Sequence, residues 1–180
     1  MQEAEVLERA RRGDADAERA LFDAHVDRVY RLAYRMTGDE EAALECAQDV
    51  FVRAFDKLDS FRGDSAFSTW LHSITARVVI DRIRKQQRQR KREVAVPDVR
   101  EVEPAAPSGD PGLKVVLARA IDGLSDILKA VFVLHDIEGF KHPEIAAMLG
   151  VPEGTSRARL SRAREQLRAV LSPQQAEDWT

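Results

Sequence analysis

The sequence predicts an all-α protein with two small helical domains joined by a flexible linker. Apolar residues recur at helical spacing along almost the whole chain, and no alternating strand pattern competes with them. The stretch 94–112 interrupts this periodicity with four prolines. A chain of 180 residues, 44% of them hydrophobic, is long and apolar enough to build two small cores.

The first domain is expected over residues 1–93, with three main helices. Asp14 is a suitable N-cap for a helix that runs to about Met36, and Asp39 is a suitable N-cap for the next helix. After a polar loop, Ser65 is expected to cap a long third helix. Each helix carries an apolar stripe, so the three can pack around one core.

The linker, residues 94–112, is rich in proline and acidic residues. Proline removes a backbone donor and fixes φ, so a helix cannot persist through this stretch. We expect a semi-extended segment without a core of its own.

The second domain is expected over residues 113–172, followed by a tail, 173–180. Two helices come first. A short helix then starts at Pro143, where a missing N–H costs little. Gly150 marks a turn, and the last helix should begin at Glu153 and end near residue 171.

The last two helices form a helix-turn-helix pattern, because a short helix and a glycine turn precede a longer basic helix. Its arginines are Arg157, Arg159, Arg162, Arg164 and Arg168. In helix-turn-helix proteins the second helix enters the major groove, and the planar fork of arginine suits guanine edges and phosphates. The pattern favours DNA binding over the alternative of a solvated basic helix.

A second basic zone ends the long helix of the first domain. It comprises Arg77, Arg82, Arg84, Lys85, Arg88, Arg90, Lys91 and Arg92. Such a zone is large enough to contact several phosphates. Phe67 and Trp70 precede it, and aromatic side chains beside basic ones can stack on unpaired bases. Phe67 is better interpreted as core, whereas core and DNA contact are equally good interpretations of Trp70.

Residues 1–60 lean toward acidic charge. A helix that exposes Gln48 and Asp49 would repel DNA and suit a protein partner instead. Phe51 either lies exposed beside them or anchors the helix in the core.

Catalysis finds little support in the sequence. The four histidines are scattered, and His135-Asp136 is a lone dipeptide without a second cluster of metal ligands. No glycine-rich phosphate loop or nucleophile motif occurs. We expect a protein that is not an enzyme and has no cofactor, metal or catalytic residue.

Cellular location is expected to be the cytoplasm. The N-terminus has no basic and apolar signal, and no run of about 18 apolar residues could cross a membrane. The single cysteine, Cys46, cannot form an internal disulfide, and its place on an apolar stripe favours a core position.

These features together resemble the extracytoplasmic-function (ECF) group of the sigma-70 family, over nearly the whole chain. Segments similar to region 2 of that group are Asp49-Val50-Phe51, Leu58 to Phe67, Trp70-Leu71 and Asp81-Arg82. Segments similar to region 4 are Glu138-Gly139-Phe140, Glu144-Ile145-Ala146, Leu149 to Pro152, Gly154-Thr155 and Arg159 to Arg164. The combination is much more specific than a lone helix-turn-helix.

The resemblance implies a region 2 helical bundle, a region 4 helix-turn-helix and the function of an alternative sigma factor. The implied partners are bacterial core RNA polymerase, through its β′ clamp helices and β subunit, promoter DNA and an anti-sigma factor, with no membrane insertion. Core polymerase would be bound by Gln48, Asp49 and Phe51. Single-stranded -10 DNA would be held by Phe61, Arg62, Ser65, Trp70, Arg77, Arg84 and Lys85. The -35 duplex would be read by Thr155, Ser156, Arg157, Ala158, Ser161 and Arg162.

Three residues depart from the pattern of the family. Arg77 stands where asparagine is usual, Ser156 where an apolar residue is common, and Ala158 where serine is frequent. These departures bear on the promoter sequence that is read. The rival interpretation is an autonomous helix-turn-helix regulator, whose first domain would dimerise or sense a signal. The acidic helix and the Phe61–Ser65 loop favour the sigma factor.

Overall fold

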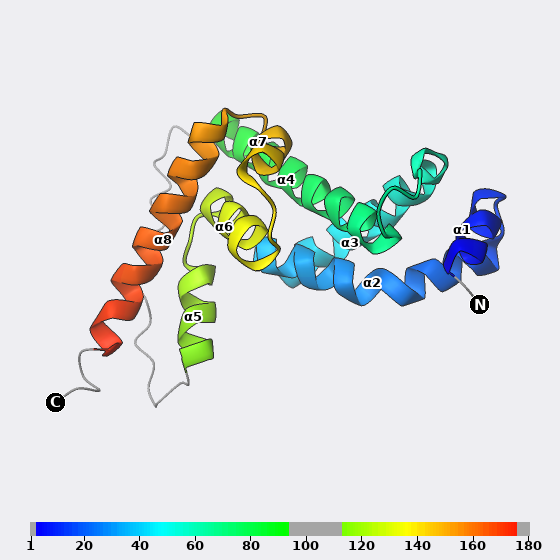
Figure 1. The fold of residues 1–180 in the computed structure, drawn as a ribbon. Helices are drawn as coiled ribbons and strands as arrows, with labels where there is room; N and C mark the ends of the chain where they lie inside the picture. Colours follow the sequence, from blue (N-terminus) through cyan, green and yellow to red (C-terminus); the bar gives the residue numbers. More distant parts are fainter. Residues whose placement is uncertain (1–2, 94–112, 176–180) are drawn as a thin grey trace. The chain divides into compact units, whose positions relative to one another are not determined.

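The computed structural model describes residues 3–93 and 113–175, and every regular element in these ranges is a helix (Figure 1). The all-α prediction is therefore confirmed. The chain divides into two compact units, Met1–Arg82 and Ile83–Thr180. The expected linker, 94–112, lies outside the described residues.

The elements follow one another in a simple order. The N-terminal half contains α1 (Glu3–Arg11), α2 (Ala15–Thr37), α3 (Glu40–Asp56), the 3₁₀ turn η1 (Leu58–Ser60) and α4 (Phe67–Glu93). The C-terminal half contains α5 (Leu113–Asp122), α6 (Asp126–Phe132), the π-helical segment η2 (Val133–Ile137), α7 (His142–Leu149) and α8 (Glu153–Gln175).

Both aspartate caps of the first unit are confirmed. The Asp14 carboxylate accepts hydrogen bonds from the amides of residues 16 and 17, at 3.1 and 3.2 Å. The Asp39 carboxylate accepts one from the Ala42 amide at 2.7 Å. Between α2 and α3, Gly38 adopts a left-handed φ of 69° and donates its N–H to the carbonyl of Tyr34. A side chain at this position would be strained, so glycine permits the abrupt end of α2.

The expected Ser65 cap is wrong by one residue. The amides of Thr69 and Trp70 both donate to the carbonyl of Ala66, so this residue precedes the first turn of α4. The Ser65 hydroxyl reaches the same Ala66 carbonyl at 3.5 Å and caps no helical amide. Ser65 therefore belongs to the loop.

Helix α8 is longer than expected and continues through Pro173 to Gln175. The fixed φ of proline, about −65°, is itself helical, and near a helix end only its own amide bond is lost. The first three residues of the expected tail are thus helical, and residues 176–180 lie outside the described part of the chain.

The core of the first unit lies among α2, α3 and α4. Its deeply buried residues include Ala33, Met36, Ala43, Cys46, Val50, Ala54, Phe67 and Leu71. Helix α1 packs on α2 and buries Val6, Leu7 and Ala10.

The core of the second unit is built around α8, which packs on α5, α6 and α7. Leu160, Ala163 and Leu167 form the inward row that the spacing predicts, and all three are buried. Ala163 and Leu167 form a hydrophobic cluster with Ala120, Leu124 and Leu128. None of the helices in the described ranges is both long and apolar enough to span a bilayer.

Candidate nucleic-acid interface

The loop between η1 and α4 rests on a cluster of three aromatic rings. Phe61 is buried, and its ring centroid lies 5.6 Å from that of Phe67 and 5.3 Å from that of Trp70. Residues 62–65 are exposed, and Gly63 turns the chain with a φ of 78°. This corrects the expectation that the Phe61 side chain contacts DNA, because its ring supports the loop from inside.

One face of α4 carries aromatic and basic residues in a line. Trp70, Arg77 and Arg84 are seven residues apart, and at about 100° per residue seven steps return to nearly the same direction. Trp70 is half-buried at the edge of the aromatic cluster, so its ring packs on Phe61 and Phe67 while part of it stays open to solvent. Arg77 and Lys85 are exposed, and Arg84 is half-buried. The stripe therefore joins a stackable ring to positive charge.

Two ion pairs join α3 to α4. A guanidinium nitrogen of Arg53 lies 3.3 Å from a carboxylate oxygen of Asp81, and Arg82 pairs with Glu45. Arg82 therefore takes part in helix packing. The basic face of α4 is smaller than the number of its arginines and lysines indicates, because the charge of Arg82 is paired with Glu45.

The outer face of α3 is partly apolar. Leu44 and Val52 are 56% and 61% exposed, and Gln48 lies between them at four-residue spacing, so the three form one row. Glu45 and Asp49 flank this row and are also exposed. Exposed apolar side chains rimmed by acidic ones are typical of a protein-binding surface rather than a DNA-binding one. Helical spacing places Leu44 among the apolar residues expected to be buried in α3, so the sequence pattern does not predict its exposure.

Phe51 does not belong to this outer face. Its side chain is 4% exposed, and its ring packs against Phe22, 4.6 Å between centroids, and against Phe55 at 6.0 Å. The expectation that Phe51 contacts a partner directly is corrected, and the alternative in which it anchors α3 in the core is confirmed.

The helix-turn-helix is formed by α7 and α8. Gly150 has a left-handed φ of 58° and ends α7, and the amide of Val151 donates to the carbonyl of Ala146 at 3.1 Å. Ile145, Ala146 and Leu149 face inward from α7, opposite the buried row of α8. The sharp turn leaves the first turns of α8 with an outer face in solvent.

The expected -35 residues divide between that outer face and the interior. Arg157, Ala158, Ser161 and Arg162 are exposed, and Thr155 is half-buried. Arg157 donates through Nε to a Glu153 carboxylate oxygen at 3.1 Å. Ser156 is fully buried, so the expectation that its side chain contacts DNA is corrected.

Ser156 begins a chain of polar contacts that joins α8, α7 and η2. Its Oγ lies 3.0 Å from Nδ1 of His142, whose ring stacks on that of His135 at 4.5 Å. Nδ1 of His135 contacts Asp136 at 2.8 Å, and Asp136 accepts two hydrogen bonds from Arg164, at 2.9 and 2.6 Å. Arg164 therefore holds α8 against η2.

Two pKa values in this chain of contacts are lowered. Partial burial lowers the pKa of His142, and the positive charges of His135 and Arg157 lower it further. The pKa of Asp136 is lowered chiefly by the hydrogen bond from Arg164. Neutral His142 and ionised Asp136 are the forms that the folded unit favours.

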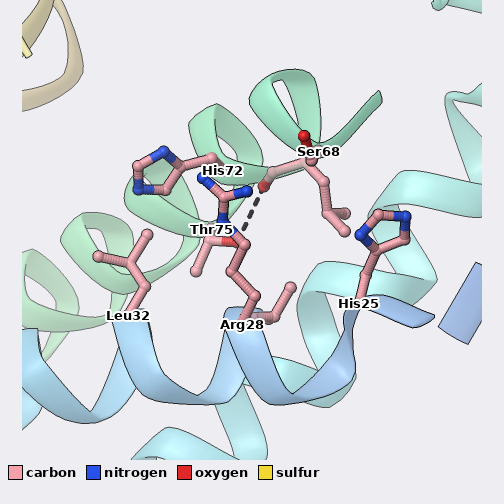
Figure 2. Close-up of a pocket in the computed structure, with 8 residues that line it drawn as sticks. His25, Arg28, Leu32, Ser68, His72 and Thr75 are labelled. Atoms are coloured by element: carbon pink, nitrogen blue, oxygen red, sulfur yellow. Dashed lines mark hydrogen bonds between the residues drawn. The ribbon is translucent and has the colours of Figure 1, made fainter. Parts of the chain in front are cut away.

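A small pocket lies between α2 and α4 (Figure 2). Its lining residues are His25, Arg28, Val29, Leu32, Ser68, Leu71, His72 and Thr75. The Thr75 hydroxyl donates to the carbonyl of Leu71 at 2.8 Å, the dashed line in Figure 2. Nε2 of His25 lies 3.3 Å from a Glu3 carboxylate oxygen, and its ring packs edge-on against Phe67 at 5.3 Å. His25 therefore connects α1 to the aromatic cluster.

Among the described residues, no group of three or more potential metal ligands gathers. Cys46 is buried as expected, and burial raises the pKa of its thiol to about 11.

Comparison with known proteins identifies both units. Residues 21–89 match the family model of Sigma-70 region 2, and residues 114–167 match that of Sigma-70 region 4. The ECF RNA polymerase sigma factor SigW of Bacillus subtilis is 32% identical over 92% of this chain and 94% of its own length. SigE of Mycolicibacterium smegmatis, also an ECF sigma factor, is 38% identical over 87% of this chain, which spans 62% of the length of SigE.

Two solved structures have a similar fold. The sigma factor RpoE of Bartonella quintana, in complex with the anti-sigma factor NepR, is 26% identical with a TM-score of 0.57, over 86% of this chain and 96% of RpoE. CnrH in complex with the cytosolic domain of CnrY is 26% identical with a TM-score of 0.53, over 93% of this chain and 96% of CnrH. With both family models matched in order and a relative such as SigW covered almost from end to end, the chain belongs to the ECF sigma factors of the sigma-70 family.

Proposed function

We propose that this chain is an alternative sigma factor that binds core RNA polymerase and directs transcription initiation at a particular set of promoters. Residues 1–93 would bind the polymerase and the -10 element, and residues 113–172 the -35 element, with 94–112 as the linker. The observation that carries the proposal is the pairing of opposite surfaces in the first unit. Helix α3 exposes an acidic and apolar face, and α4 exposes an aromatic and basic one.

The α3 face would contact the β′ clamp helices of the polymerase. Leu44 and Val52 supply apolar area, and Gln48 and Asp49 supply directional polar contacts. Asp49→Arg would place a positive charge against the surface of the polymerase that complements the negative charge of Asp49. This variant should therefore abolish binding to core polymerase.

The matched control is Asp27→Arg, which makes the same charge change at an exposed residue of α2. Both variants should keep the helix content of the wild type by circular dichroism. Normal affinity of the Asp49→Arg variant for core polymerase would remove the support for this interface.

The exposed loop and the α4 stripe would hold the -10 strand. Residues 62–65 surround a turn open to solvent, so an unstacked base can enter beside Arg62 and Ser65. Trp70 would stack on a neighbouring base, and Arg77, Arg84 and Lys85 would contact phosphates. The buried ring of Phe61 would act on DNA only by holding the loop.

Helix α8 would read the -35 duplex through its exposed first turns. The ion pair of Arg157 with Glu153 is exposed and therefore worth little, so the guanidinium can exchange it for a guanine edge. One bidentate arginine–guanine pair contributes about 1–3 kcal/mol of discrimination, or about 5- to 150-fold. Thr155, Ala158, Ser161 and Arg162 would complete the surface.

Transcription from randomised -35 elements tests this assignment. Arg157→Ala should relax the preference at one or two positions, whereas Arg168→Ala, farther along α8, should weaken all promoters by a similar factor. If both variants lower transcription by the same factor on every -35 sequence, Arg157 contacts only phosphate and reads no base.

The rival function is that of an autonomous helix-turn-helix regulator. Measuring DNA binding by the chain with and without core polymerase distinguishes it from a sigma factor. A second unit that neutralises about four phosphates should give a log–log salt slope of about −3 to −4 and weak binding by the free chain. Core polymerase should raise affinity by presenting both DNA-reading domains together. Tight, sequence-specific binding by the free chain at physiological salt would support the rival.

We also propose a cytoplasmic location, an anti-sigma partner and no catalytic activity of the chain's own. The cytoplasmic location follows from the proposed function, because a sigma factor acts where core polymerase and the chromosome are. RpoE and CnrH, which share this fold, are each bound to another protein in their solved structures, and RpoE is bound to an anti-sigma factor.

A further inference from the structure

Helix α1 is fixed in place by contacts at its C-terminal end. It buries Val6, Leu7 and Ala10, and Nε of Arg9 donates to a carboxylate oxygen of Asp14 at 2.8 Å. Because Asp14 also caps α2, this hydrogen bond joins the end of one helix to the start of the next. The last turn of α1, which carries Arg11, therefore has a defined direction.

Arg11 extends from that turn to the base of the exposed loop. Its Nε donates to the carbonyl of Leu58 at 3.4 Å, and one terminal nitrogen donates to the carbonyl of Phe61. The other terminal nitrogen pairs with Glu8, one turn back on α1. The Arg11 side chain is only 27% exposed, so these contacts are partly shielded from water.

The residue that opens the loop is thus held from two directions. The ring of Phe61 packs against Phe67 and Trp70, and its carbonyl accepts a charged hydrogen bond from Arg11. Glu3, at the other end of α1, contacts His25, which packs on Phe67. Helix α1 therefore supports both the backbone and the aromatic floor of the loop.

We propose that Arg11 is a positioning residue for the loop 61–65, and that α1 is part of the apparatus that captures the -10 strand. The inference rests on the proposed function, in which this loop holds an unstacked base. Without the guanidinium, the carbonyls of Leu58 and Phe61 lose their charged donor, and residues 62–65 must be ordered when DNA binds. That ordering entropy would weaken capture of the strand.

The geometry requires arginine rather than any cation. The fork of Arg11 contacts two carbonyls and a carboxylate from one plane, whereas the ammonium of lysine is a point charge on a flexible stem. Arg11→Lys should therefore restore part of what Arg11→Ala loses. Arg12 supplies a matched control, because it is the next residue, is exposed and carries the same charge.

The experiment uses the full chain bound to core polymerase and three variants, Arg11→Ala, Arg11→Lys and Arg12→Ala. Affinity is measured for core polymerase, for a -35 duplex and for single-stranded oligonucleotides with a randomised -10 element. Arg11→Ala should bind core polymerase and the -35 duplex normally, lose about tenfold in affinity for the best -10 strand, and discriminate less between -10 sequences. The affinity of Arg11→Lys for the -10 strand should lie between that of Arg11→Ala and that of the wild type. The affinity of Arg12→Ala should match the wild type.

Hydrogen exchange of the amides of residues 62–65 in the free chain gives a readout that needs no DNA. Arg11→Ala should accelerate their exchange, and Arg12→Ala should not. Unchanged exchange together with wild-type capture of the -10 strand would overturn the proposal, as would an equal loss on every -10 sequence and on the -35 duplex. Failure of the wild-type complex to bind any -10 strand would instead overturn the proposed function of the loop.

Discussion

Replacing Ser156 with alanine removes the hydroxyl that lies 3.0 Å from Nδ1 of His142. Ser156 is fully buried, whereas His142 is half-buried and can recover part of the lost bond from water. A net intramolecular hydrogen bond contributes about 0.5–1.5 kcal/mol, and the missing oxygen leaves only a small void. We expect the free energy of unfolding of the second unit to fall by about 1 kcal/mol.

Native-state hydrogen exchange measures this loss inside the full chain. The amides of Leu160 and Ala163 lie in the buried row of α8, so their protection reports the opening of the second unit. A double-mutant cycle of Ser156→Ala and His142→Ala should give a coupling energy of about 1 kcal/mol. Ser161→Ala, an exposed serine on the same helix, should stay within about 0.5 kcal/mol of the wild type.

The partial burial of His142 and the charges around it also make stability depend on pH. The pKa of His142 is lowered from the ordinary value of 6.5, so the folded state favours the neutral ring. The free energy of unfolding should therefore be highest above pH 6.5. It should fall as the pH drops below 6.5 toward the lower pKa that His142 has in the folded state. Positive charge on His135, Arg157 and Arg164 acts in this direction, and Glu153 opposes it. A coupling energy near zero, or an unchanged pH profile in His142→Ala, would refute this reasoning.

Three shorter predictions test the cores and a cap. Asp39→Ala removes the cap bond to the Ala42 amide and should lower the free energy of unfolding of the first unit by about 1 kcal/mol in urea titration; an unchanged midpoint would contradict this. Leu160→Ala should cost about 2–5 kcal/mol, so that -35 binding is lost while affinity for core polymerase through the first unit remains. Cys46, buried with a pKa raised to about 11, should resist iodoacetamide at pH 8 until the chain unfolds, and Cys46→Ser should leave any oxidant response unchanged.

Local chemistry explains which elements could be predicted from the sequence. Asp14 and Asp39 cap helices because their carboxylates bond amides two or three residues away, which is a short-range property. The inward row of α8 likewise follows from helical spacing alone. Helix α1 could not be found this way, because a helix of nine residues has little stability until it packs on α2.

The sequence assigns segments of the chain to function, but it does not predict which side chains in them are exposed. Phe51 and Phe61 lie in segments that the sequence assigns to polymerase and DNA binding, yet each ring is buried. The partner ring of Phe51 is Phe22, which is remote in sequence, and no spacing rule specifies such a pair. Ser156 is similar, since its hydroxyl is satisfied by His142, 14 residues earlier. Exposure of a small polar or aromatic residue depends on tertiary partners, which periodicity does not encode.

The two-residue connection between α2 and α3 also sets the order in which the first unit can fold. Helices that contact each other across Gly38 and Asp39 close a very short loop, so the entropy of bringing them together is small. Local pairings of this kind form faster than long-range ones. The hairpin is complete once Asp56 has left the ribosome, before α4 has emerged from it. We expect α2 and α3 to form the folding nucleus, onto which α4 docks when its aromatic start emerges.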